Sequence, residues 1–325
     1  MSEPPLLELD RLSTHFVTAR GTRVVKAVDE VSLTLRAGET LGVVGESGSG
    51  KTTLALSIMR LLPTAARIVG GGLRFAGEDL LAKSPSEMRH IRGKRIAMIL
   101  QDPMASLNPL FTVGDQVAEP VRVHEHTGRR GARERAHKLL KAVKIPAPEQ
   151  RLREYPHQMS GGMRQRIVGA IAMSCEPRVL IADEPTTSLD VTIQAQYLRL
   201  LRELQKEHGL ALIFITHNLG IVARMCDSVA VMYAGRVIES GPVRTIFNAP
   251  VHPYTQALIE SIPRLGGGPS RLTAIDGQPP DLASLPSGCS FQPRCPKALD
   301  RCREDVPDNI MVAPGHGARC WLAAR

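Results

Sequence analysis

The residues in this chain best suited to chemistry form a glycine-rich stretch between residues 45 and 53. They match the pattern G-x-x-x-x-G-K-[ST], whose glycines let backbone N–H groups turn inward around an anion. Lys51 would add a full positive charge near the outer phosphates, and the Thr52 hydroxyl is the expected Mg²⁺ ligand. The stretch therefore predicts a nucleoside triphosphate site made of Gly45, Glu46, Ser47, Gly48, Ser49, Gly50, Lys51, Thr52 and Thr53.

The segments on either side of this stretch are those that a phosphate-binding loop requires. Residues 40–44 are mostly apolar and predict a buried strand. Residues 53–62 predict a helix that ends at Pro63 and adds partial positive charge at the loop. The apolar side chains expected on one face of that helix are Leu54, Ile58, Leu61 and Leu62.

Three further strand-like segments end in polar residues. The apolar segments 96–100, 179–182 and 210–215 are followed by Gln101, by Asp183 with Glu184, and by Thr216 with His217. Polar residues at the carboxyl ends of strands beside a phosphate loop predict a parallel sheet with its ligand crevice on that edge. Before the loop, residues 6–9, 24–28 and 31–35 predict short strands, the last with the period-two alternation of an antiparallel sheet.

Phe16 is notable because aromatic residues make up only 3% of the chain. Its ring could stack on an adenine or fill a gap in the core. Taken alone, an Asp-Glu pair at a strand end is often a solvated turn, and a single His is usually structural. Their joint occurrence with a phosphate loop favours a functional interpretation.

Taken together, these motifs resemble those of the ATP-binding subunit of an ABC transporter, and the resemblance covers nearly the whole chain. Residues 159–166 match the family's signature motif, residues 188–190 its D-loop, and His217 its switch histidine. Two residues depart from the family pattern: Met163 stands where Gln is usual, and Asn218 stands where Asp is common. The resemblance implies an α/β fold with a P-loop NTPase (RecA-like) core, an antiparallel β subdomain, a helical signature subdomain and a small irregular C-terminal extension.

Within this resemblance each polar residue has an expected role in ATP hydrolysis. Asp183 would hold Mg²⁺ together with Thr52 and Gln101. Glu184 would orient or deprotonate the attacking water, a role that suits a carboxylate within hydrogen-bond reach. His217 would contact the γ-phosphate and stabilise charge as the bond breaks. Gln101 would also report the nucleotide state to a membrane subunit.

Ser160, Gly161 and Gly162 precede a predicted helix over residues 163–173, whose N-terminus is a second anion site without a lysine. In the family, two subunits stack head to tail. The resemblance therefore implies that this N-terminus contacts the γ-phosphate bound by the other subunit.

The overall composition is that of an ordinary packed globular protein, with 43% hydrophobic residues and a formal net charge of +9. The positive charge could face nucleic acid or anionic lipid, although a solvated helix face is the commoner explanation. The longest apolar runs are too short to span a membrane, and no secretory signal is evident at the N-terminus. Nucleotide use and these absences predict a protein on the cytoplasmic side, and the resemblance implies that it is peripheral at the cytoplasmic face of the inner (plasma) membrane.

The tail beyond residue 250 is rich in Pro and Gly, and residues 266–269 predict a linker. Four cysteines then fall in a segment that could hardly build a core unaided: Cys289, Cys295, Cys302 and Cys320. Their spacing, with Pro296 directly after Cys295, favours an iron–sulfur site over zinc or unligated thiols. Residues 252–258 are similar to the C-terminal extension of the oligopeptide/dipeptide (nickel) branch, in which the matching tail carries a structural [4Fe–4S] cluster.

We expect an ATPase domain over residues 1–250, with a helical subdomain at about 103–175, and an extension over 251–325. The resemblance implies that ATP and Mg²⁺ power import of peptides, or of a related solute, through a separate permease. The implied partners are two integral membrane permease subunits, a related but different second ATPase and an extracytoplasmic substrate-binding protein, with no nucleic acid. The alternatives are a soluble ABC ATPase acting on nucleic acid or ribosomes, and a regulatory nucleotide-binding subunit.

Overall fold

The computed structural model describes residues 4–17, 21, 23–187, 189–262 and 275–324. The predicted linker at 266–269 and Ser188 of the predicted D-loop lie outside the described residues. The chain divides into two compact units. The first comprises Met1–Leu35, Thr40–Leu81 and Phe214–Arg325, and the second comprises Arg36–Glu39 and Ala82–Ile213.

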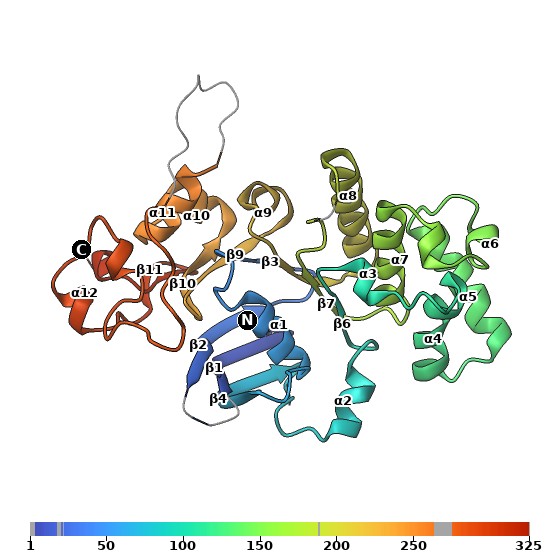
Figure 1. Cartoon of the computed structure of the whole chain (residues 1–325), viewed down its shortest axis with the longest axis horizontal. Helices are drawn as coiled ribbons and strands as arrows, with labels where there is room; N and C mark the ends of the chain where they lie inside the picture. Colours follow the sequence, from blue (N-terminus) through green and yellow to red (C-terminus); the bar gives the residue numbers. More distant parts are fainter. Residues whose placement is uncertain (1–3, 18–20, 22, 188, 263–274, 325) are drawn as a thin grey trace. The chain divides into compact units, whose positions relative to one another are not determined.

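An antiparallel sheet of the first unit has the strand order β2-β1-β4-β5. Strands β2, β1 and β4 lie side by side in Figure 1. The strands are β1 (Leu7–Val17), β2 (Val24–Leu35), β4 (Ala66–Phe75) and β5 (Glu78–Asp79). The predicted strands at 24–28 and 31–35 are in fact one strand, β2. A register shift on β2 lies where Glu30 has a left-handed φ of 50°. At this shift β2 has one residue more than β1, which forms a β-bulge. The bulge interrupts the alternation of apolar and polar residues without ending the strand.

A second set of strands in the first unit begins with β3 (Thr40–Val44), which is wholly buried. Strand β9 (Ser228–Tyr233) pairs parallel with β3, with Val43 opposite Ala230. Antiparallel neighbours follow in the order β10 (Arg236–Pro242), β12 (His316–Ala318) and β11 (Ile310–Ala313). The C-terminal tail thus adds two strands to the sheet that contains β3.

Helix α1 (Lys51–Met59) begins within the phosphate-binding loop and ends earlier than predicted. Arg60 ends it by adopting a left-handed φ of 50°. Leu54 and Ile58 are buried as predicted, but Leu61 lies beyond the helix with 48% of its surface exposed. The prediction for Leu61 was wrong because it took Pro63 as the end of the helix. A proline sets only the last position that a helix can reach, and this helix ends earlier, at Met59. The other helices of this unit are α9 (Leu219–Met225), α10 (Val243–Asn248), α11 (Pro253–Glu260), η2 (Gln292–Arg294), α12 (Arg301–Glu304) and η3 (Trp321–Ala324).

The second unit pairs β6 (Ile96–Ile99) in parallel with β7 (Val179–Asp183), and the chain passes between the units within β8 (Ala211–Ile215). These strands agree with the three apolar segments predicted before polar residues. Helices α4, α5 and α7 pack together around buried side chains such as Val117, Ala136 and Ile167 (Figure 1). The helices of this unit are α2 (Pro85–Ile91), α3 (Pro103–Ser106), α4 (Val113–Glu125), α5 (Arg129–Ala142), α6 (Pro148–Arg151), η1 (Pro156–Gln158), α7 (Gly161–Met173) and α8 (Val191–His208).

Across the described residues, every helix is too short or too polar to cross a membrane. The proposed domain limits at residues 250 and 251 stay a prediction.

Candidate nucleotide site

The loop between β3 and α1 has a backbone that only glycine can adopt at two of its turns. Gly45 has a φ of 155°, and a Cβ there would lie 2.2 Å from the carbonyl oxygen of Met232. Gly50 has a φ of 101°, and its Cβ would lie 2.1 Å from the carbonyl oxygen of Ala27. The spacing of glycines in the sequence therefore reflects close approach of this loop to neighbouring backbone.

Lys51 lies across this loop, with only 6% of its surface exposed. Its Nζ donates to the carbonyl oxygens of Gly45 at 2.9 Å and Glu46 at 2.8 Å. An ammonium group held against the first two residues of a glycine-rich loop favours a phosphate at the same place. Thr52 follows in the first turn of α1 and is exposed, so it is accessible to a cation.

In the second unit, the structure brings Gln101 and Glu184 together. Gln101 Nε2 donates to Glu184 Oε2 at 3.0 Å, and Thr187 Oγ1 donates to the same oxygen at 2.9 Å. Asp183 is the last residue of β7 and is 2% exposed. Glu184 is half-buried, and a half-buried carboxylate beside a buried one at the end of a strand can act on water and on a cation.

The signature segment also lies in the second unit, where Ser160 begins α7. Its hydroxyl oxygen accepts from the Met163 N–H at 3.3 Å and caps the helix. Ser160 and Gly161 are exposed, so the N-terminus of α7 can meet a ligand. A Cβ on Gly162 would lie 2.7 Å from Ile193 Cγ2, which explains the glycine at that position.

His217 and Phe16 belong to the first unit with the phosphate-binding loop. His217 is exposed, at the turn between β8 and α9. The next residue, Asn218, caps α9 by accepting from the N–H groups of Gly220 at 2.9 Å and Ile221 at 3.3 Å. Asn218 thus caps the helix as the Asp that is common at this position in the family would. Phe16 is half-buried in β1, opposite Val25 of β2.

Comparison with known proteins gives the family of this chain. The family described as "ABC transporter" matches residues 28–187, and "Oligopeptide/dipeptide transporter, C-terminal region" matches residues 238–302. The chain is 52% identical over 318 residues to the "Probable peptide ABC transporter ATP-binding protein y4tR" of Sinorhizobium fredii, covering 97% of this chain and 94% of that protein. The chain belongs to the ATP-binding proteins of peptide ABC transporters.

Other members of the family give the same result. The dipeptide transport ATP-binding protein DppD of Escherichia coli is 47% identical over 315 residues, covering 97% of this chain and 96% of that protein. The dimeric post-hydrolysis structure of the ATP-binding cassette MJ0796, bound to ADP and Pi, superimposes with a TM-score of 0.65 at 25% identity. It covers 73% of this chain and 99% of that chain. The chain is thus an ABC transporter ATPase, and the predicted α/β P-loop fold with an antiparallel β subdomain is confirmed.

The structure also identifies residues around the ABC phosphate loop that the sequence did not reveal. The Glu46 N–H donates to the Tyr254 hydroxyl oxygen at 2.9 Å, and the Glu46 carboxylate pairs with Arg294. The sequence placed Glu46 among nucleotide-binding residues, but its carboxylate is directed at the tail. Arg294 stands 248 residues further along the chain, so no local pattern could have linked the two.

The four cysteines of the tail do not form a metal site in the structure. Among the described residues, no group of three or more His, Cys, Asp or Glu side chains is placed to hold a metal ion. Burial, together with the charges of the other three cysteines, raises the pKa of Cys289 to about 11. The four thiols are thus close enough to influence one another.

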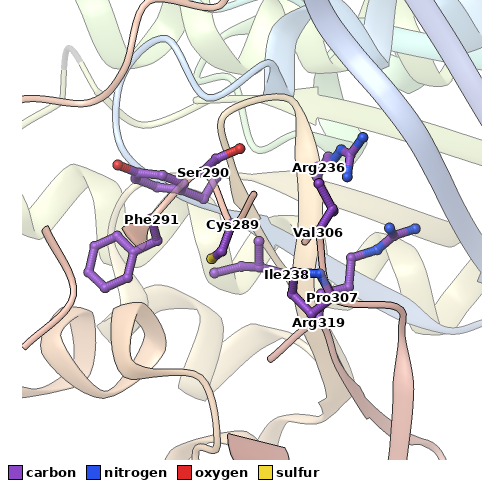
Figure 2. Close-up of a pocket in the computed structure, with 9 residues that line it drawn as sticks. Arg236, Ile238, Cys289, Ser290, Phe291, Val306, Pro307 and Arg319 are labelled. Atoms are coloured by element: carbon purple, nitrogen blue, oxygen red, sulfur yellow. The ribbon is translucent and has the colours of Figure 1, made fainter. Parts of the chain in front are cut away.

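Cys289 instead lines a small cavity with Ile238, Phe291, Arg236 and Arg319 (Figure 2). The cavity has a volume of about 20 Å³. That is room for roughly one water molecule.

Proposed function

We propose that this ATPase powers the import of peptides, or of a related small solute, through a separate membrane permease. The observation that carries the proposal is its similarity, over nearly its full length, to proteins named for dipeptide transport. The match of the tail to the oligopeptide/dipeptide transporter C-terminal region supports the same class of solute.

The proposal extends to the location and partners of the chain. The ATPase acts as a peripheral subunit at the cytoplasmic face of the membrane, beside two integral membrane permease subunits. A related but different ATPase completes the nucleotide-binding pair, and an extracytoplasmic binding protein delivers the solute. The dimeric form of the similar cassette MJ0796 supports pairing of two ATPase subunits.

The proposed roles of the residues follow from their chemistry. The N–H groups of the loop and the Lys51 ammonium bind the phosphates, while Thr52, Asp183 and Gln101 hold Mg²⁺. When bound, Mg²⁺ neutralises charge on the transferred phosphoryl group. Glu184 accepts the proton of the attacking water, and Gln101 orients that carboxylate through the hydrogen bond described above.

Two further groups stabilise the charge that develops on the γ-phosphate. His217 contacts it from the same subunit. Ser160, Gly161 and Gly162 present the N-terminus of α7 to the nucleotide of the partner subunit, where N–H groups and the helix dipole favour an anion. The exposure of Ser160 and Gly161 supports this role. Phe16 stacks on the adenine ring, which its half-buried position in β1 permits.

A gene deletion with complementation tests the proposed function. A strain lacking this gene should lose uptake of a radiolabelled dipeptide, and the wild-type gene should restore it. Glu184→Gln should not restore uptake, although the protein should accumulate normally. Dipeptide uptake that is unchanged by the deletion would rule out the proposed solute class, and a screen of other small solutes would follow.

The iron–sulfur cluster at Cys289, Cys295, Cys302 and Cys320, with zinc as the alternative, is part of the proposal from the sequence spacing. Anaerobic purification and metal analysis decide it. Brown protein with about four irons per chain supports the cluster, stoichiometric zinc supports the alternative, and metal-free protein leaves four thiols as the structure places them.

A further inference from the structure

An ion pair connects the C-terminal tail to the phosphate-binding loop within the first unit. Arg294 Nη1 donates to Glu46 Oε2 at 2.8 Å, and Arg294 Nη2 donates to Glu46 Oε1 at 3.0 Å. The Arg294 side chain is 5% exposed and that of Glu46 is 26% exposed. A two-point contact between a planar guanidinium and a carboxylate fixes orientation as well as distance.

Arg294 also contacts residues of the tail and of strand β9. Its Nε donates to the carbonyl oxygen of Asp276 at 2.9 Å. Its guanidinium lies 5.8 Å from the ring centre of Tyr233 and 5.9 Å from that of Phe291. Both rings are almost completely buried. Contacts on β9 and in the tail therefore help to orient Arg294 in addition to its pairing with Glu46.

Glu46 is held at its backbone as well as at its side chain. Its N–H donates to the Tyr254 hydroxyl at 2.9 Å, and its carbonyl accepts from Lys51 Nζ at 2.8 Å. Burial raises the pKa of Tyr254, so its hydroxyl stays protonated even above the pH at which an exposed tyrosine ionises. Two contacts from the tail and one from the loop lysine thus fix the second residue of the loop.

The charge of Glu46 makes this contact more than a means of attaching the tail. A carboxylate in a loop that binds phosphates repels them unless a cation neutralises it. Arg294 is the cation that the structure pairs with it.

We propose that Arg294 is a positioning residue for nucleotide binding, which neutralises and orients Glu46 so that the loop can accept the phosphates of ATP. The proposal rests on the nucleotide site described above. It gives the C-terminal tail a direct effect on ATP affinity through one side chain.

The test measures MgATP affinity of the full-length chain by isothermal titration calorimetry. In Arg294→Gln the unneutralised Glu46 should raise the Kd about tenfold, which is about 1.4 kcal/mol. Adding Glu46→Gln to Arg294→Gln removes the repelling charge and should return the Kd to within about threefold of wild type. In the assembled transporter, the KM for ATP should rise in Arg294→Gln while kcat at saturating ATP changes little.

Two further variants control for damage to the tail. Arg301→Gln removes another tail arginine, which lies 3.6 Å over the Trp321 ring and pairs with Asp305. It should leave the Kd unchanged. Arg294→Lys keeps the charge without the two-point contact and should fall between wild type and Arg294→Gln, so it tests the proposal even if Arg294→Gln does not fold.

The possible outcomes distinguish failure of the role proposed for Arg294 from failure of the nucleotide site itself. Wild-type affinity in both Arg294→Gln and Arg294→Lys would overturn the role of Arg294. A weakened Arg294→Gln that Glu46→Gln does not rescue would overturn it too, because simple loss of packing would then explain the change. Wild-type protein that binds no MgATP would overturn the nucleotide site itself.

Discussion

The side-chain amide of Gln101 donates to the carboxylate of Glu184, with 3.0 Å between Nε2 and Oε2. Glu184 also has a left-handed φ of 45°, which is uncommon for a residue other than glycine. Such strain costs on the order of 1–3 kcal/mol and is typical of functional sites. Both observations support assignment of Glu184 as the group that acts on water.

Replacing Glu184 with Gln should abolish most steady-state ATP hydrolysis and keep ATP affinity. The amide oxygen of the new side chain can still accept from Gln101, but the amide cannot take a proton. Loss of a general base lowers turnover by roughly 10²–10⁴-fold. Phosphate release by the assembled complex measures turnover, and calorimetry on the chain measures affinity. Glu207→Gln, an exposed carboxylate on α8, is the matched control. Turnover in Glu184→Gln equal to wild type would remove Glu184 from catalysis.

Replacing Lys51 with Met should weaken MgATP binding while nearly preserving the volume of the side chain. The variant loses the ammonium that spans the loop and its donations to Gly45 and Glu46. Hydrogen bonds to charged groups contribute about 2 kcal/mol, so the Kd should rise roughly thirtyfold or more. Lys206→Met removes an exposed lysine of α8 and should bind as wild type does. Equal affinity in Lys51→Met and Lys206→Met would contradict the phosphate role.

Replacing Ser160 with Ala should weaken ATP-driven pairing of two ATPase subunits. Ser84 offers a matched control, because its hydroxyl caps α2 at 3.3 Å from the Glu87 nitrogen, the distance that Ser160 shows to Met163. Each substitution should cost about 1 kcal/mol of stability. Only Ser160→Ala should reduce the dimer fraction, measured by light scattering in a Glu184→Gln background with MgATP and the second ATPase. A similar loss of dimer in Ser84→Ala would show that helix capping, and not contact with the nucleotide, determines the dimer fraction.

The sequence predicted the phosphate loop and the central strands because their signals are local. Gly45 and Gly50 stand where the backbone leaves no room for a side chain, and residues 179–182 of β7 and all of β8 are apolar. The end of α1 was less predictable, because arginine has no particular preference for the left-handed conformation that Arg60 adopts. The bulge at Glu30 could not be predicted either, because the residues around it are ordinary strand residues.

Contacts between distant segments were beyond reach of the sequence. The pairing of Arg294 with Glu46 depends on where the tail folds back, and neither residue is unusual in its own neighbourhood. The four cysteines are the opposite case, because here the sequence did contain a signal. It suggested a cluster, yet spacing alone does not determine whether four thiols converge, and in the described residues they form no metal group.

The buried side chain of His252 should make stability of the first unit depend on pH. His252 is 2% exposed, and its Nδ1 accepts from the Tyr254 N–H at 3.0 Å at the start of α11. Burial lowers the pKa of His252 from 6.5 to about 3. Between those values the unfolded chain binds a proton that the folded chain does not. The stabilising contribution is therefore complete above pH 6.5 and is lost progressively as the pH falls toward 3.

His252→Asn separates this effect from the titration of other groups. Asn can still accept from the Tyr254 N–H as a helix cap, but it does not titrate. Urea unfolding should show wild type losing stability relative to His252→Asn by about 1.4 kcal/mol for each pH unit below 6.5. Over the range from pH 6.5 to 5 the difference should change by about 2 kcal/mol. Parallel pH profiles for the two proteins would mean that the folded chain takes up the same proton, and that His252 is not held neutral.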